Sequence, residues 1–304
     1  MHVDAPESVP TSPEGGAPID AVVDPRTRRL CFGGVGFDLQ WEAGHDFALL
    51  DADRGACLPG LHAGGEPVAG HVRCMIHWGN EDILGPVEVR DAGPGVRAFS
   101  GLGTRGELHD LGGGRYRAGL TVNPRQRGCG SALRLLAGLV LESSGGLSLH
   151  AAAVVIDGGA VLFTGPSGAG KSTACELSTG ERCLAYDHVA LTPSADGYSA
   201  WRIPMGEAAS LPLTADPVLP LRGILCVQRG EISPGIRPSD AAQVLFDVRR
   251  AIDVADPSAQ AEAARLDAAH RLAQRIPVAR VETVLGKPIG PLLRDWLAAE
   301  ADRG

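Results

Sequence analysis

The stretch LSLHAAAVVIDGGAVLFTGPSGAGKST, residues 147–173, decides the fold of the C-terminal half of the chain. Two apolar runs flank Asp157-Gly158-Gly159, and an Asp-Gly pair between apolar runs is a strong hairpin signal. The second run, residues 160–164, leads directly into a glycine-rich loop, after which a helix is expected. The stretch therefore predicts a strand, a tight turn, a second strand, a glycine loop and a helix, in that order.

The glycine loop matches the pattern G-x-x-x-x-G-K-[ST], which is typical of phosphate binding. Glycines let the backbone fold tightly so that its N–H groups point at phosphate oxygens, and the helix that follows adds its positive end. In this pattern the lysine reaches the β- and γ-phosphates and the serine hydroxyl binds Mg²⁺. The sequence thus predicts a site for ATP and Mg²⁺ formed by Gly165, Pro166, Ser167, Gly168, Ala169, Gly170, Lys171, Ser172 and Thr173.

Lysine usage supports this interpretation. Of 28 basic residues only Lys171 and Lys287 are lysines, so a chain that otherwise uses arginine has a compact ammonium at the position where the pattern requires one. A chance match would occur in about one chain in 300.

The Mg²⁺ ion also needs a carboxylate ligand, and Asp187 follows the apolar run that begins at Arg182. We take Asp187 as a counterpart of the Walker B aspartate; the alternative is an aspartate that merely ends a strand.

Composition excludes several classes of protein. The formal net charge is −8, which provides no basic face for nucleic acid. Seven scattered cysteines without a CxxC pair suit reduced thiols in a cytoplasmic protein. The N-terminus lacks the features of a signal peptide. The best membrane candidate, residues 133–141, contains Arg134 and is too short to span a bilayer, so no membrane association is expected.

The chain divides into three predicted parts. Residues 1–25 are rich in proline and small residues and predict a flexible leader. Residues 26–128 contain short alternating runs cut by glycines, which predict a β-rich N-terminal module. Residues 129–304 predict a mixed α/β nucleotide-binding domain. Within it we expect a strand over 182–191, a strand over 221–228, and helices over 131–144 (capped by Ser131), 239–252 (capped by Ser239), 259–276 and 290–301.

Metal sites other than the phosphate loop find little support in the sequence. His71 and His77 flank Cys74 at spacings that suit no standard zinc site. We interpret them as strand and turn residues.

Residues 150–189 resemble HPr kinase/phosphorylase and its relatives, whose fold is related to that of ATP-dependent phosphoenolpyruvate carboxykinase. The features shared with the family are Leu149-His150 at the start of a strand hairpin, the loop from Gly165 to Ser172, and a later strand that ends in acidic residues. The resemblance continues weakly through IPMGE at 203–207, and residues 1–128 take no part in it. It implies an HPr kinase/PEP carboxykinase-like P-loop nucleotide-binding domain of the α/β class, preceded by the β-rich N-terminal module.

The resemblance also implies roles for individual residues. His150 matches the active-site histidine, and Glu207 is the candidate for a later catalytic or metal-binding glutamate. The family has two aspartates where this chain, aligned without gaps, has Tyr186 and Asp187; a shift by one residue would match Asp187 and His188 instead. The first aspartate acts as the base and the second serves the metal. The candidates for catalysis are therefore His150, Asp187, His188 and Glu207, and those for the metal are Ser172 and Asp187.

Three functions follow as hypotheses. The first is an ATP-dependent kinase that transfers the γ-phosphate to a hydroxyl of a protein, a peptide or a small molecule, with the N-terminal module helping to choose this acceptor. The second is a phosphoenolpyruvate carboxykinase, which an assay with oxaloacetate and ATP would test. The third is a catalytically weak or inactive ATP-binding regulatory module, suggested by Tyr186 in place of an acid. True HPr kinases are hexamers, so a homo-oligomer is one option.

Overall fold

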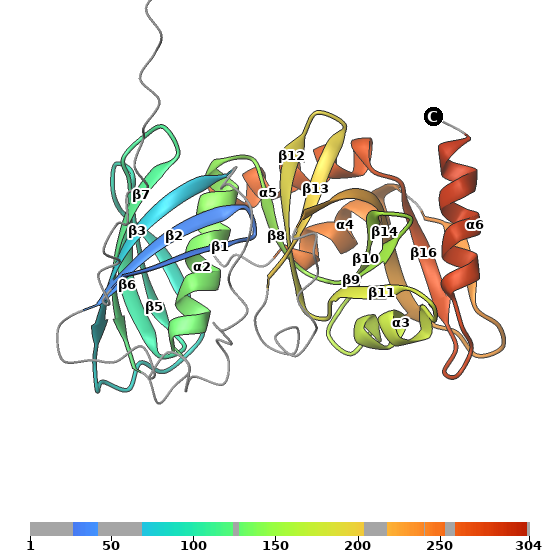
Figure 1. The fold of residues 1–304 in the computed structure, drawn as a ribbon, viewed down its shortest axis with the longest axis horizontal. Helices are drawn as coiled ribbons and strands as arrows, with labels where there is room; N and C mark the ends of the chain where they lie inside the picture. The colour runs from blue at the N-terminus through green and yellow to red at the C-terminus, as the bar shows by residue number, and fades with distance from the viewer. Residues whose placement is uncertain are drawn as a thin grey trace, which may run out of the picture.

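The computed structural model describes residues 27–41, 69–123, 128–203, 218–239, 241–252 and 259–302. They form two β-sheets with one helix between them and further helices on the second sheet (Figure 1). The architecture is mixed α and β, as the sequence predicts. In these ranges no helix is both long and apolar enough to cross a membrane. The predicted leader, residues 1–25, lies outside the described residues.

Seven strands form the first sheet, in the order β1-β2-β3-β7-β6-β5-β4. β2, β3 and β7 run parallel to one another, and the other neighbours are antiparallel. In β7 the side chains of Tyr116, Ala118 and Leu120 are buried and alternate with exposed positions, as expected for a sheet with one covered face. The strands are β1 (Thr27–Phe32), β2 (Val35–Trp41), β3 (Gly70–Trp78), β4 (Glu88–Gly93), β5 (Val96–Gly101), β6 (Thr104–Asp110) and β7 (Arg115–Val122).

Nine strands form the second sheet, in which β11-β9-β10-β14-β13-β12-β8 is the main order and β16 pairs with β14 and β15. β14 runs parallel to β10 on one side and to β16 on the other. β10 and the middle of β14 are buried on both faces, which explains their continuous apolar runs, whereas in β16 buried positions alternate with partly exposed ones. The strands are β8 (Leu147–His150), β9 (Ala152–Ile156), β10 (Gly159–Thr164), β11 (Arg182–Ala185), β12 (His188–Ser194), β13 (Gly197–Arg202), β14 (Val218–Arg229), β15 (Gly235–Pro238) and β16 (Val278–Thr283).

Helices cover the second sheet on both faces. Side chains of α4 and α5 share one apolar core with the sheet, and side chains of α3 and α6 share the core on the opposite face. β10 serves both cores, because Leu162 faces α4 and α5 whereas Phe163 faces α3 and α6. The helices are α2 (Gly128–Ser143), α3 (Lys171–Leu177), α4 (Ala241–Ala251), α5 (Ala259–Arg275) and α6 (Gly290–Ala301).

Helix α2 lies between the two sheets (Figure 1). Leu133, Leu136 and Val140 are fully buried in the core of the first sheet, at the helical spacing that the sequence shows. The same helix contacts β8 and β12 of the second sheet. The division of the chain near residue 128 therefore stays a prediction, since α2 belongs by its packing to the first sheet as well. Ser131 lies inside α2, so the prediction that it caps this helix is wrong.

Strands β8 and β9 pair with β12 and β11 as one antiparallel ladder that is interrupted in the middle. His150 lies opposite His188 on one side of the gap, and Ala153 lies opposite Ala185 on the other. Tyr186 and Asp187 bend away from the ladder at the gap. The prediction of one strand over 182–191 is wrong in this respect, because the chain changes its pairing partner between β11 and β12.

His71, Cys74 and His77 lie on β3, which confirms the interpretation of the two histidines and the cysteine as strand residues. Cys74 is fully buried in the core, whereas the even spacing places His71 and His77 on the other face of the sheet. Three side chains on opposite faces cannot share one metal ion.

The β9–β10 hairpin forms as predicted, with Ile156 opposite Gly159 and a two-residue turn between them. Asp157 and Gly158 have φ angles of 47° and 74°, both in the left-handed region that such turns require.

We expect Gly158→Ala to lower the free energy of unfolding by about 1 kcal/mol. An added Cβ has open space there, but the positive φ angle is unfavourable for alanine. Urea unfolding measures this cost. Gly119→Ala, on an exposed strand position with equally open space, is the matched control and should cause no loss.

Candidate active site

The phosphate loop, residues 165–170, connects the end of β10 to the start of α3, which is the strand–loop–helix order that the sequence predicts. Its three glycines, Gly165, Gly168 and Gly170, have φ angles of 144°, 77° and 99°. Any other residue would be strained at these angles. A Cβ at position 165 would also lie 3.1 Å from the Ala169 Cβ. Arg229, at the end of β14, donates a hydrogen bond of 3.0 Å to the Gly168 carbonyl oxygen and fixes the loop from outside.

Lys171 is folded back over this loop. Its Nζ donates hydrogen bonds to the carbonyl oxygens of Gly165 and Pro166, at 3.1 and 3.4 Å, and the residue is only 7% exposed. Burial lowers the pKa of its ammonium, while the negative charge of Asp187 acts in the opposite direction. The ammonium therefore lies inside the loop and close enough to Asp187 to be influenced by its charge.

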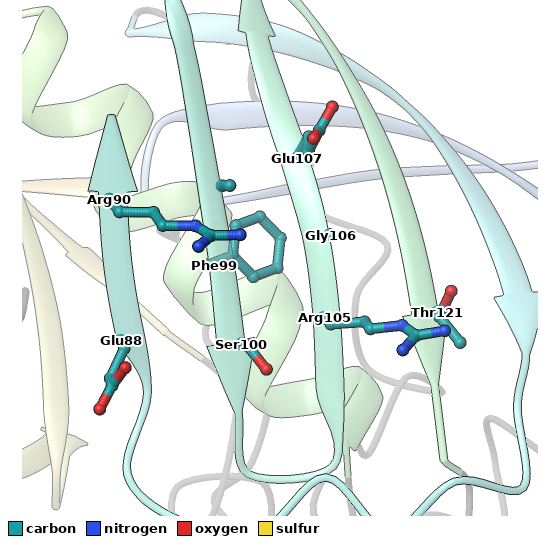
Figure 2. Close-up of a pocket in the computed structure, with 9 residues that line it drawn as sticks. Glu88, Arg90, Phe99, Ser100, Arg105, Gly106, Glu107 and Thr121 are labelled. Atoms are coloured by element: carbon teal, nitrogen blue, oxygen red, sulfur yellow. The ribbon is translucent and has the colours of Figure 1, made fainter. Parts of the chain in front are cut away.

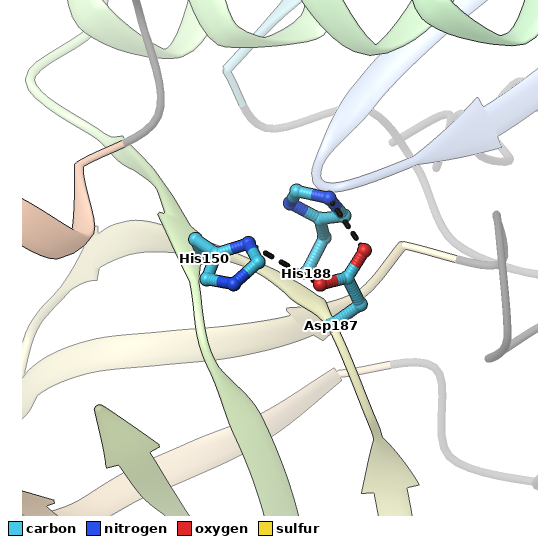
Figure 3. Close-up of side chains that lie close together, drawn as sticks. All are labelled: His150, Asp187 and His188. Atoms are coloured by element: carbon cyan, nitrogen blue, oxygen red, sulfur yellow. Dashed lines mark ion pairs between the residues drawn. The ribbon is translucent and has the colours of Figure 1, made fainter. Parts of the chain in front are cut away.

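Asp187 joins the two histidines that flank the gap in the ladder (Figure 3). Its Oδ1 is 3.2 Å from Nδ1 of His150, and its Oδ2 is 2.9 Å from Nε2 of His188. The imidazole rings meet edge to face with centroids 5.3 Å apart. The cluster forms because the register pairs β8 with β12 at these histidines and because the bend at residues 186–187 frees the aspartate from the sheet.

Arg134 is the residue that sequence reasoning missed. It projects from α2, and its guanidinium contacts Nε2 of His188 and contributes a positive charge beside Asp187. The signal in the sequence is a single arginine in an otherwise apolar helical run, which by itself argues only against a membrane span. Through this residue the helix that packs on the first sheet reaches the cluster on the second.

The groups around Asp187 favour the ionised form of its carboxylate. The hydrogen bond from His188 is the largest cause, burial opposes it, and the charges of Arg134 and of the two histidines, which are positive only when protonated, add to it; together they lower the pKa of Asp187 to about 2. A carboxylate with this pKa stabilises the fold at pH values above its ordinary titration near 3.8, and the stabilisation disappears as the pH falls toward 2.

We therefore expect the wild-type protein to exceed Asp187→Asn in stability at pH 6, and the difference to shrink between pH 4 and pH 2. The effect should be small, because 37% of the Asp187 side chain is exposed and solvent screens its charge. Urea midpoints of both proteins, measured at a series of pH values, test this. Exposed Asp196, replaced by asparagine, serves as the control, and a difference that stayed constant with pH would contradict the expectation.

Exposure separates the roles that the two histidines can have. The His150 side chain is 39% exposed, so a bound molecule can reach it, whereas the His188 side chain is 4% exposed and lies beneath Arg134 and Asp187. A general base must contact the proton that it removes. His150 fits this requirement, and His188 fits the role of a buried partner that orients Asp187.

The donor atoms of His150, Asp187 and His188 all lie within 4.8 Å of one another, which is close enough to hold a metal ion. A cation bound by both imidazoles conflicts with Arg134, whose positive charge contacts the Nε2 atom that would be the ligand. Mg²⁺ prefers oxygen atoms. Asp187 and the hydroxyl of Ser172, in the first turn of α3, carry oxygen atoms of the kind that Mg²⁺ prefers, and the negative charge of Asp187 acts on the Lys171 ammonium.

Neither Tyr186 nor Glu207 is part of the described cluster. The Tyr186 hydroxyl forms a hydrogen bond with Cys183, and its ring packs against the core that contains α3, so this side chain does not join the His150–Asp187–His188 cluster. Glu207 lies outside the described residues, and its predicted role stays a prediction.

A separate hollow of about 440 Å³ lies on the exposed side of the first sheet. Figure 2 shows Arg90 and Arg105 crossing it, with Glu88 and Glu107 on the same strands. Arg105 also forms an ion pair with Glu81, with a nitrogen–oxygen distance of 2.6 Å. None of the residues that line this hollow belongs to the phosphate loop or the histidine cluster.

No family model matches the chain, and no curated protein matches it either. Among solved structures, the chain is similar to the HPr(Ser) kinase/phosphatase from Coxiella burnetii with 14% sequence identity. This similarity covers 51% of the present chain and 95% of the other, with a TM-score of 0.26. These values indicate a distant structural relation only.

Proposed function

We propose that the protein is an ATP-dependent kinase that transfers the γ-phosphate to a hydroxyl group of a protein, a peptide or a small molecule. The observation that carries the proposal is the arrangement of Lys171: its ammonium lies within a glycine loop between β10 and α3 and is influenced by the charge of Asp187. Phosphoryl transfer depends mainly on positioning and charge neutralisation, and this arrangement offers both.

Different residues would bind the phosphates, hold the metal ion and accept the proton. Backbone N–H groups of the loop, which Pro166 lacks, and the Lys171 ammonium would bind the phosphates. Ser172 and Asp187 would hold Mg²⁺, which neutralises phosphate charge when bound. The Nδ1–H of His150 donates to Asp187, which leaves the ring's Nε2 as the nitrogen that accepts the proton of the acceptor hydroxyl. The acceptor oxygen then bonds to the γ-phosphorus, the bond to the β,γ-bridging oxygen breaks, and ADP keeps its electrons.

His150 thereby replaces the family's first aspartate, whose position Tyr186 occupies in the ungapped alignment. Imidazole is the most common general base in enzymes, and the contact with Asp187 orients the His150 ring for this role. The absence of an aspartate base at position 186 therefore does not require a loss of activity.

Two measurements test the proposal. Calorimetry should show that ATP binds more tightly than AMP in the presence of Mg²⁺, because the loop binds the β- and γ-phosphates. Incubation with ATP labelled on the γ-phosphate should then transfer label to serine- or threonine-containing peptides, to small hydroxyl compounds or slowly to water. Absence of affinity for any purine triphosphate would refute the proposal.

A second candidate is an ATP-binding regulatory module without turnover. The observation in its favour is that Tyr186 contacts Cys183 rather than the cluster, so the usual acid is missing from the site. Tight ATP binding without hydrolysis or transfer, in the presence of a broad set of hydroxyl acceptors, would select it over the kinase.

A further inference from the structure

Two thiols lie close together between α3, the helix that follows the phosphate loop, and β11. Cys175 belongs to α3 and Cys183 to β11, and the two side chains are hydrogen-bonded to each other. Their Sγ atoms lie 3.8 and 3.6 Å from the same oxygen atom, the Ala185 carbonyl. The phosphate chemistry proposed above uses neither thiol. Nothing in the sequence pairs these two cysteines, because they come from different elements and show no CxxC spacing.

The two cysteines differ in environment. Cys175 is 6% exposed, whereas Cys183 is partly exposed and accepts hydrogen bonds from Cys175 and from the Tyr186 hydroxyl. These hydrogen bonds and the positive charge of Arg202 lower the pKa of Cys183, while the hydrogen bond to Cys183 and burial raise that of Cys175. Such a difference is expected for a pair in which one sulfur meets the oxidant and the other resolves the product.

We propose that Cys175 and Cys183 form a hydroperoxide-sensitive thiol pair that closes to an intramolecular disulfide. The Cys183 thiolate attacks one oxygen of hydrogen peroxide, the O–O bond breaks, and the released hydroxide takes a proton and leaves as water. Cys183 is then a sulfenic acid. The Cys175 sulfur attacks the Cys183 sulfur, the S–O bond breaks, and the departing oxygen leaves as a second water with the proton of the Cys175 thiol. Two thiols are oxidised and one peroxide is reduced.

The bridge would join the two segments that bear on the phosphate site. α3 begins at Lys171 and carries Ser172, and β11 is followed after one residue by Asp187. A disulfide draws two sulfur atoms to about 2 Å, so the bridge would fix the position of α3 relative to β11. A consequence for nucleotide binding rests on the proposed function, whereas formation of the bridge does not.

The experiment treats the reduced full-length protein with one equivalent of hydrogen peroxide and maps the products by mass spectrometry of unreduced digests. We expect a mass lower by about 2 Da and a peptide that links Cys175 to Cys183, both reversed by dithiothreitol. In Cys175→Ser, a dimedone adduct should appear on Cys183. In Cys183→Ser, Cys175 should remain a thiol. Cys31→Ser, which removes a buried thiol of the first sheet, should bridge like the wild-type protein.

The outcomes separate the bridge from its consequence. Oxidation of Cys183 to sulfinic acid without a bridge, or a bridge between other cysteines, would overturn the proposal. With the bridge formed, calorimetry with Mg·ATP should show at least a ten-fold loss of affinity that dithiothreitol restores. Equal affinity of the bridged and reduced proteins would overturn the link to nucleotide binding, and absence of ATP binding in the reduced protein would instead count against the proposed function.

Discussion

Lys171→Ala is expected to lower the rate of γ-phosphate transfer from ATP by roughly 10²- to 10³-fold, the usual cost of removing one group that stabilises transition-state charge. The ammonium of Lys171 already lies within the loop, held by the carbonyl oxygens of Gly165 and Pro166. On nucleotide binding it would exchange these carbonyls for phosphate oxygens without a large movement. Transfer assays with labelled ATP and calorimetry with Mg·ATP measure the loss of rate and of affinity.

Lys287 supplies a matched control, since it is the chain's other lysine. It is exposed, lies between β16 and α6, and donates to the Ile232 carbonyl oxygen. Lys287→Ala removes the same charge from the chain and should leave transfer unchanged. Circular dichroism of both variants excludes unfolding as the cause. Full activity in a folded Lys171→Ala protein would mean that the loop does not serve phosphate transfer.

The hairpin, the loop and the helix that follows it were predictable because their signals are local. The Asp-Gly turn determines the register of β9 and β10, and the glycine pattern determines where β10 ends and α3 begins. Long periodic segments behaved similarly: α4, α5 and α6 formed where the sequence places helices, within a few residues at their ends. Chain-local chemistry was sufficient for these elements.

The assembly of the site was beyond local reasoning. His150 and Asp187 were each predicted as candidates, but their contact depends on the pairing of β8 with β12. It also depends on the bend at residues 186–187, and no residue between 182 and 191 predicts this bend. Arg134 comes from the helix predicted over 131–144, and no local pattern links that helix to residues 187 and 188. A side chain's role in a site depends on what tertiary structure brings to it, and a single sequence records only its type.

Replacement of His150 should mainly lower the rate of transfer, whereas replacement of His188 should mainly lower the stability of the fold. His150→Ala is expected to reduce transfer by roughly 10²-fold or more, the typical contribution of a positioned base, with ATP affinity unchanged. Its side chain is 39% exposed, so its loss should cost less than about 1 kcal/mol of stability. His188→Ala removes a buried ring and leaves Asp187 and Arg134 without this partner, which should cost about 2 kcal/mol or more.

Chemical rescue distinguishes a base from a structural residue. Imidazole added to the solution can enter the exposed space left by His150→Ala and accept the acceptor's proton, so part of the lost rate should return as its concentration rises. The buried space left by His188→Ala is closed to solvent, and no rescue is expected there. Transfer rates should be compared at a temperature where both variants are folded, as judged by thermal unfolding. If His150→Ala keeps full activity while folded His188→Ala loses it, then the base is not the exposed imidazole, and the mechanism derived from the His150–Asp187 contact is wrong.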